Sequence, residues 1–297
     1  MRRSKKVEGA GVARRRRVPV ILIILLVLAL TAVVILVDSN TRMVTTEFEL
    51  YYGNLPAAFD GYRIVVLSDI HAAEIGKGNE TLIDIVSNAK PDMIAITGDL
   101  IDKVQAAKPV WKQLEIAGQL IEGLTPIAPV YYVTGNHEWD SGEIWSLLAL
   151  LEEKGVHVLR NNYTLLESGG ETIILAGTDD PNGPADMVKP RKFIRGIFDA
   201  EGEGFTVVLT HRNSNLDLYG ALGVDLVLCG HAHGGLIRLP FTDGLIGPRL
   251  DFFPTHTNGL YTAGGTNMVV SRGVGNHMGW TRFLNNPQVV VVELRRA

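Results

Sequence analysis

The chain has 297 residues, 46% of them hydrophobic and 20% charged, which is typical of a globular protein and excludes an intrinsically disordered one. The net charge of −4 is unevenly distributed, because residues 1–17 carry eight Lys or Arg and one Glu, whereas the remainder carries 20 basic and 31 acidic residues. So acidic a body argues against a nucleic-acid-binding surface, which requires clustered Lys and Arg. The single cysteine, Cys229, excludes an intramolecular disulfide but does not fix the compartment.

Residues 18–37 form an uncharged apolar run of 20 residues. A helix of that length spans a hydrocarbon core of about 30 Å, so we expect a transmembrane anchor. The basic tail at residues 1–17 favours a cytoplasmic N-terminus. This predicts a single pass of the plasma membrane, with everything after Asp38 on the extracytoplasmic side.

Two alternatives to an uncleaved anchor remain open. A cleaved signal peptide has a shorter apolar core of about 7–15 residues and a small-x-small cleavage site, which Ile35–Asp38 does not provide. A buried core helix would need complete burial on every side. The paired arginines of the tail also resemble a twin-arginine export signal.

Strands and helices are expected to alternate after a linker at residues 38–60, which itself contains an alternating first strand at residues 47–52. This rhythm predicts α/β packing. The predicted strands are 62–68, 93–97 and 130–134, and the predicted helices are 78–89, 104–121 and 142–154.

The second half of the chain shows short strand patterns with few long helices between them. It therefore predicts further sheet, and we expect residues 61–297 to form one catalytic domain. The strand candidates are 156–159, 164–166, 172–176, 206–209, 225–228, 268–271 and 289–294.

Polar residues directly follow five of these apolar runs. Ligands of α/β proteins collect at the carboxyl ends of strands, so these side chains are expected to meet at one place. The residues are Asp69 and His71, Asp99, Asn136 and His137, His211, and His231 and His233.

The residue types predict a metal site. Carboxylate, imidazole and amide donors together suit Mn, Fe, Zn or Co, whereas an all-oxygen set suits Ca or Mg. Seven donors are too many for one tetrahedral site and fit two sites that share a carboxylate. Two metals about 3.5–4 Å apart can hold both oxygens of a displacement at phosphorus. The sequence has no P-loop and no GxSxG elbow, so the competing hydrolytic routes lack support.

The motifs D-x-H, G-D, G-N-H-E, a later His and G-H-A-H, in this order, resemble the calcineurin-like metallophosphoesterase superfamily from about Tyr62 to Leu294. The residues 230–235, 259–261 and 271–275 are similar to its bacterial membrane-anchored branch. The resemblance implies two packed mixed β-sheets flanked by helices, here preceded by the transmembrane helix. One departure concerns residues 280–288, which lack the glutamate that the branch often carries before its last strand.

The same resemblance implies a role for each polar residue. One metal would be held by Asp69, His71, Asp99 and His233, and the second by Asp99, Asn136, His211 and His231. Asp99 would be the bridge. His137 would face the substrate phosphate, where it donates a proton to the leaving group or stabilises charge.

For several other residues, the sequence gives weaker support for a role in the site. His157 is expected to be structural, in a surface strand, and Cys229 to fill a buried strand. His256, His277 and Arg272 could reach the substrate from glycine-rich loops, and Asp179 and Asp180 form a turn that could line the site.

The leading functional hypothesis is a two-metal hydrolase of phosphate esters, with a phosphodiester or pyrophosphate as substrate, at the extracytoplasmic membrane surface. A lipid or cell-envelope precursor is the preferred substrate class, because the anchor holds the site near the bilayer. Two alternatives are an extracellular nucleotide phosphodiesterase and a non-catalytic, metal-stabilised binding domain. The sequence does not identify the metal, the natural substrate or the oligomeric state.

Overall fold

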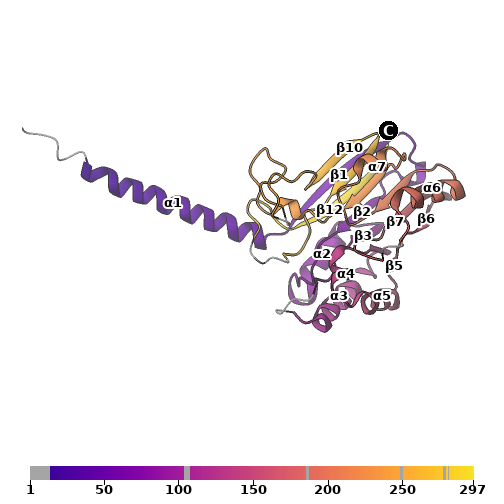
Figure 1. Ribbon diagram of the computed structural model, residues 1–297, viewed down its shortest axis with the longest axis horizontal. Helices are drawn as coiled ribbons and strands as arrows, with labels where there is room; N and C mark the ends of the chain where they lie inside the picture. Colours follow the sequence, from indigo (N-terminus) through magenta and orange to yellow (C-terminus); the bar gives the residue numbers. More distant parts are fainter. Residues whose placement is uncertain (1–13, 104–107, 185–186, 248–249, 277–278, 280) are drawn as a thin grey trace, which may run out of the picture.

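The body of the protein consists of two six-stranded sheets packed face to face (Figure 1). The computed structural model describes residues 14–103, 108–184, 187–247, 250–276, 279 and 281–297. Both sheets are mixed and helices flank the pair, so the fold expected from the resemblance is confirmed.

The first sheet has the order β1-β12-β2-β3-β4-β5. The first three polar clusters follow its strands β2, β3 and β4, and β1 pairs in parallel with β12 at the edge. The bounds are β1 Val44–Tyr52, β12 Gln288–Arg296, β2 Arg63–Leu67, β3 Met93–Thr97, β4 Val130–Val133 and β5 His157–Val158.

The second sheet has the order β10-β11-β9-β8-β7-β6, and its strands β8 and β9 precede the remaining polar residues. The bounds are β10 Gly259–Ala263, β11 Thr266–Val270, β9 Leu226–Cys229, β8 Thr206–Leu209, β7 Glu171–Gly177 and β6 Asn162–Ser168.

Helices cover the outer face of each sheet, so the inner strands are buried on both sides, whereas the edge strands β1, β6 and β10 are partly exposed. In β2, for example, Ile64 and Val66 lie in the core between the sheets, whereas Val65 and Leu67 lie in the core under the helices. Burial on both sides explains why the sequences of these inner strands are continuous apolar runs rather than alternating apolar and polar residues. The helices are α2 Glu80–Asn88, α3 Val110–Leu124, α4 Asn136–Asp140, α5 Ile144–Glu153, α6 Pro190–Glu201 and α7 Leu216–Gly220, with short 3-10 helices η1 Ala57–Phe59, η2 Lys77–Asn79 and η3 His233–Gly235.

Helix α6 is the longest helix among the described residues of the second half, which agrees with the expected few long helices there, although its position was not predicted. Its apolar residues recur with helical spacing, and Ile194 and Ile197 are buried against the second sheet. The expected helix at 104–121 begins later, at Val110, and residues 104–107 of that prediction lie outside the described part of the chain.

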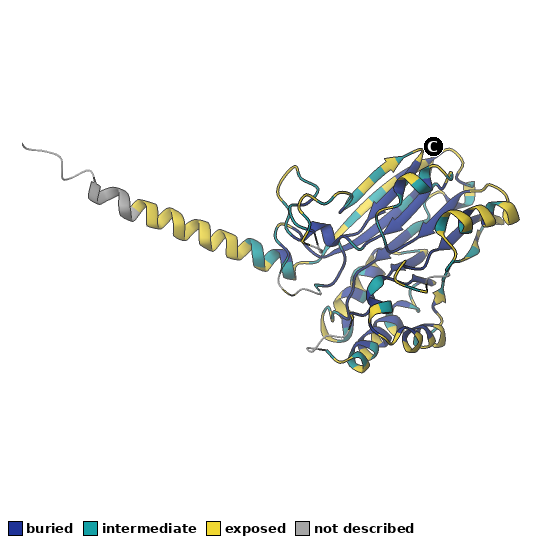
Figure 2. Cartoon of the chain, in the orientation of Figure 1, coloured by how far each residue is buried: buried dark blue, intermediate teal, exposed yellow. Residues whose placement is uncertain are grey.

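Helix α1, Arg14–Thr41, leaves the body as a single long rod (Figures 1 and 2). Its stretch Val20–Thr41 is long and apolar enough to cross a membrane, and the side chains of residues 20–34 are exposed. The last turn is held to the body: the Asn40 side chain donates to the Arg282 carbonyl at 2.8 Å, and the Asn286 side chain donates to the Asp38 carbonyl at 2.8 Å.

Candidate metal centre

All seven predicted metal donors lie just beyond the carboxyl ends of β2, β3, β4, β8 and β9, with Asn136 at the start of α4 and His233 in η3. The structure brings them together in two groups that share one carboxylate. Which of these residues bind metal stays a prediction, and it is supported by the distances between their donor atoms.

The first group consists of Asp69, His71 and His233, whose donor atoms all lie within 4.8 Å of one another. The Nε2 atom of His233 is 3.4 Å from Oδ1 of Asp69 and 3.2 Å from Nε2 of His71. All three residues are buried.

The second group consists of Asp99, His211 and His231, again with donor atoms within 4.8 Å of one another, and Asn136 joins it. The Nε2 atom of His211 lies 3.2 Å from Oδ2 of Asp99, 3.1 Å from Oδ1 of Asn136 and 3.1 Å from Nδ1 of His231. Four donor atoms thus converge on one small volume.

Asp99 connects the two groups through a single atom. Its Oδ2 is 3.2 Å from Nε2 of His211 on one side and 3.8 Å from Nε2 of His71 on the other.

The turns that carry these donors need glycine for steric reasons. A Cβ on Gly135 would lie 2.2 Å from Oδ1 of Asp99, and a Cβ on Gly230 would lie 1.8 Å from Oγ of Ser68. Neither distance is compatible with a real side chain, so the Gly in Gly-Asn-His and in Gly-His-Ala-His allows two strand-end loops to approach each other.

The donor set fits divalent metal ions. Burial raises the pKa of Asp99, but the charges of His211, His71 and His137 outweigh it and hold that pKa well below its usual range. Burial likewise opposes the charge of His211, yet Asp99 and Asp69 raise its pKa to about 10. Asp99 therefore stays ionised and draws positive charge into the site, whereas burial raises the pKa of Asp69. A borderline divalent cation would compensate the charge of both buried carboxylates.

His137 lies beside this centre and is held by a carboxylate that the sequence analysis did not single out. Its Nδ1 is 2.5 Å from Oδ1 of Asp102, and its Nε2 is 3.9 Å from Oδ2 of Asp99. Burial lowers the pKa of His137, but the hydrogen bond to Asp102 and the charge of Asp99 outweigh it and raise that pKa. An available signal was the spacing Asp99-Leu100-Ile101-Asp102 after one strand.

Glu138 ends the Gly-Asn-His-Glu motif, but the sequence assigned it no role. Its buried carboxylate accepts hydrogen bonds from the backbone N–H groups of Asp99 at 3.0 Å and of Gly135 at 2.7 Å. It thereby ties the loop after β3 to the loop after β4. Burial and the charge of Asp99 raise the pKa of Glu138 to about 7.

Arg212 supports His231 from the outer side. Its Nη1 lies 3.0 Å from Nε2 of His231, while its Nε and Nη2 donate to both oxygens of Asp180 at 2.6 and 3.0 Å. The turn residue Asp180 thus reaches the site through Arg212, and the ring orientation of His231 is set by a fixed donor.

The remaining candidates divide into near and distant residues. His157 lies exposed on β5, stacked on Tyr131 with ring centroids 4.8 Å apart, which fits a structural role. Cys229 is fully buried in β9, as expected. Arg272 is half-buried, and burial lowers its pKa to about 10. His277 lies outside the described residues.

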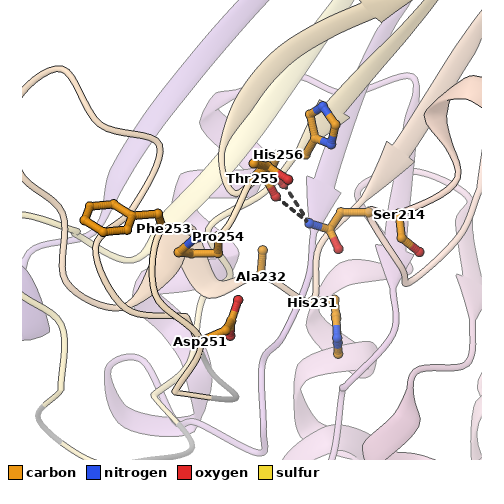
Figure 3. Close-up of a pocket in the computed structure, with 9 residues that line it drawn as sticks. Ser214, His231, Ala232, Asp251, Phe253, Pro254, Thr255 and His256 are labelled. Carbon is orange, nitrogen blue, oxygen red and sulfur yellow. Dashed lines mark hydrogen bonds between the residues drawn. The ribbon is translucent and has the colours of Figure 1, made fainter.

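A cavity of about 500 Å³ opens beside His231 (Figure 3). His256 lines it, so this residue lies at the site as one of the two expected loop histidines. The lining residues are Asn213, Ser214, His231, Ala232, Asp251, Phe253, Pro254, Thr255 and His256.

A two-sheet α/β sandwich with such a donor set at its strand ends defines a metallohydrolase. A family model described as calcineurin-like phosphoesterase matches residues 62–235, so the chain belongs to that family and the resemblance inferred from its motifs is confirmed. The chain is 30% identical over 261 residues to the Bacillus subtilis metallophosphoesterase YkuE, with 84% of this chain and 85% of that one covered.

Two further relatives carry informative names. The chain is 27% identical over 280 residues to a transmembrane protein with metallophosphoesterase domain of Danio rerio, covering 90% of this chain and 60% of that one. It is 26% identical over 242 residues to the phosphodiesterase YaeI of Escherichia coli, covering 78% of this chain and 82% of that one.

Proposed function

We propose that the protein hydrolyses a phosphodiester or a pyrophosphate with two divalent metal ions, on a substrate presented at the extracytoplasmic surface of the plasma membrane. The observation that carries the proposal is the position of Asp99 Oδ2, between His71 and His211 of two separate donor groups. One shared carboxylate between two imidazole-rich groups is the arrangement that two adjacent metal ions require.

In this proposal Asp69, His71, Asp99 and His233 hold one ion, and Asp99, Asn136, His211 and His231 hold the other. Two bound ions would neutralise charge on the phosphoryl oxygens and provide a nucleophile at neutral pH.

His137 acts on the substrate in this proposal. Asp102 fixes the His137 ring through Nδ1, and in this proposal Nε2 faces the phosphate. A protonated Nε2 donates to the leaving oxygen or stabilises the charge that develops there. The raised pKa of His137 supports the proton-donor role at neutral pH.

The choice of diester follows from the name of the relative YaeI, and the membrane location from α1 and from the transmembrane relative. A lipid-linked or cell-envelope phosphate is the proposed substrate class, because α1 fixes the body beside the bilayer.

The test uses the full-length chain in detergent micelles, freed of metal. Bis-p-nitrophenyl phosphate and p-nitrophenyl phosphate are assayed with and without Mn²⁺, beside Asp99→Asn and the matched exposed control Asp199→Asn. We expect Mn²⁺ to restore diester hydrolysis in the wild type and in Asp199→Asn but not in Asp99→Asn, and about two ions per wild-type chain. A wild type that binds metal yet hydrolyses neither ester above the Asp99→Asn background would support the binding-domain alternative instead.

A further inference from the structure

A cluster of exposed apolar side chains lies in a loop between η3 and β10, far in sequence from α1. The described residues 239–247 and 250–253, hereafter the apolar loop, hold large side chains that the body leaves uncovered. They are Leu239, Phe241, Leu250, Phe252 and Phe253, with exposures of 42%, 107%, 67%, 71% and 66%. Soluble surfaces rarely expose such a concentration of large apolar groups, and where they do the patch marks an interaction site.

Hydrogen bonds and backbone bridges order the apolar loop, so its outward-facing phenylalanines are not a sign of a loose segment. Arg238 donates through Nη1 to the carbonyls of Gly234 at 2.9 Å and Asp243 at 3.0 Å. The backbone also forms bridges between Ile237 and Ile246 and between Ile246 and Phe252. The five exposed apolar side chains therefore project from an ordered segment, whereas a surface loop usually presents polar groups to water.

A short chain of contacts joins the apolar loop to the end of α1. Asn40, in the last turn of α1, exchanges hydrogen bonds with the backbone of Arg282 at 2.8 and 3.2 Å. The next residue, Phe283, donates its N–H to the Leu236 carbonyl at 3.1 Å and accepts one from Arg238 at 3.0 Å. Figure 1 shows the loops of this region on the side of the body from which α1 leaves.

We propose that the apolar loop inserts into the interface of the same bilayer that α1 spans, as a second membrane contact of the body. Phenylalanine and leucine side chains inserted to the boundary of headgroups and acyl chains are the usual means by which an interfacial segment binds lipid. A lipid bilayer is the inferred partner of the apolar loop, because the exposed apolar surface of α1 ends where the body begins, next to the loop.

Insertion of the apolar loop would also position the cavity beside His231 relative to the bilayer. Phe253 belongs to the apolar loop and lines the same cavity as His231 (Figure 3). Insertion of the loop therefore places the rim of the cavity at the level of the lipid headgroups, where a membrane-borne phosphate ester could enter directly. This consequence rests on the proposed function, whereas the insertion itself rests only on α1 crossing a membrane.

The test labels the full-length chain with a nitroxide in phosphatidylcholine–phosphatidylglycerol vesicles. Cys229 is fully buried, so labelling is directed to one introduced thiol, Phe252→Cys or, as an independent second position, Phe241→Cys. Trp145→Cys on α5 is the matched control, since Trp145 is an aromatic residue with a similar exposure of 62%. Collisions of each label with oxygen, which concentrates in lipid, and with a water-soluble nickel complex are measured by electron paramagnetic resonance.

We expect oxygen to exceed nickel accessibility at positions 252 and 241 and the reverse at position 145. Equal nickel access at all three positions would show a loop in water and overturn the proposal. A label at 252 or 241 that is immobilised and shielded from both reagents would show a protein partner or a second copy, and would overturn it as well. None of these readings requires turnover, so failure of the insertion can be distinguished from failure of the proposed catalysis.

Discussion

Asp102 and His137 form a buried pair 2.5 Å apart, and this contact has a testable consequence. Replacing Asp102 by Asn keeps the shape but removes the charge that fixes the imidazole. If His137 is the proton donor, we expect kcat to fall by about 10²-fold with metal content unchanged. Metal analysis and kinetics with bis-p-nitrophenyl phosphate check this, with Asp199→Asn as the control. An equal loss of bound metal would instead assign Asp102 to the metal centre.

The contact between Arg212 and His231 gives a second prediction, which concerns metal affinity. Arg212→Met removes the donor that faces His231 and leaves Asp180 without its bidentate partner. Loss of such an outer contact typically weakens metal binding by about 10–100-fold. A chelator competition titration measures the affinity, and Arg195→Met on the exposed side of α6 is the control. Unchanged affinity in Arg212→Met would show that the contact does not tune His231.

The donors at strand ends could be predicted from sequence, because each directly follows an apolar run and the topology brings such ends together. Asp102, Glu138 and Arg212 could not be assigned in the same way. Their roles depend on which loop lies opposite: Glu138, for instance, faces the backbone of Asp99, 39 residues away. A single sequence does not show such an approach.

In the turn after β4, a side chain at position 135 is predicted to clash with the loop after β3. Gly135→Ala places a methyl group where Oδ1 of Asp99 lies, so we expect loss of bound metal and of activity while the fold is retained. Gly196→Ala is the matched control, because a Cβ there meets nothing within 4 Å. Circular dichroism, metal analysis and the diester assay check the pair. Full activity in Gly135→Ala would show that the loop can move away.

Gly196 also makes a separate prediction about α6. Glycine inside a helix is less favourable than alanine by about 0.5–1 kcal/mol, so Gly196→Ala should raise the free energy of unfolding of the body by that amount. Chemical denaturation followed by far-UV circular dichroism measures it. Gly223→Ala is a useful contrast, because its φ of 79° is strained for alanine and the change should destabilise.

The same glycine helps to explain why α6 was missed. Gly196 and a highly charged surface weaken the local helix signal, and the burial of Ile194 and Ile197 against the second sheet supplies what local propensity does not. β1 presents the converse case. Its alternating pattern was visible, but its partner β12 lies at the other end of the chain, and pairing across such a separation is not readable from one strand.

For the whole molecule, the proposed orientation predicts a protection pattern. In cells stripped of their wall, protease added outside should digest the body, whereas a tag placed before the basic tail should survive until the membrane is opened. The expected result follows from the cluster of basic residues preceding α1. Digestion of the tag in intact cells, with the body protected, would reverse the orientation and move the site to the cytoplasm.

The junction between α1 and the body is short: α1 ends at Thr41, and β1, which is built into the first sheet, begins at Val44. Together with the hydrogen bonds of Asn40 and Asn286, this makes the connection between α1 and the body short and ordered, in contrast to a long flexible linker. With α1 in the membrane as proposed, the enzyme would not diffuse through the solution in search of substrate. Its site would stay close to the membrane, and encounters would depend on lateral diffusion of the enzyme and of molecules in the same membrane.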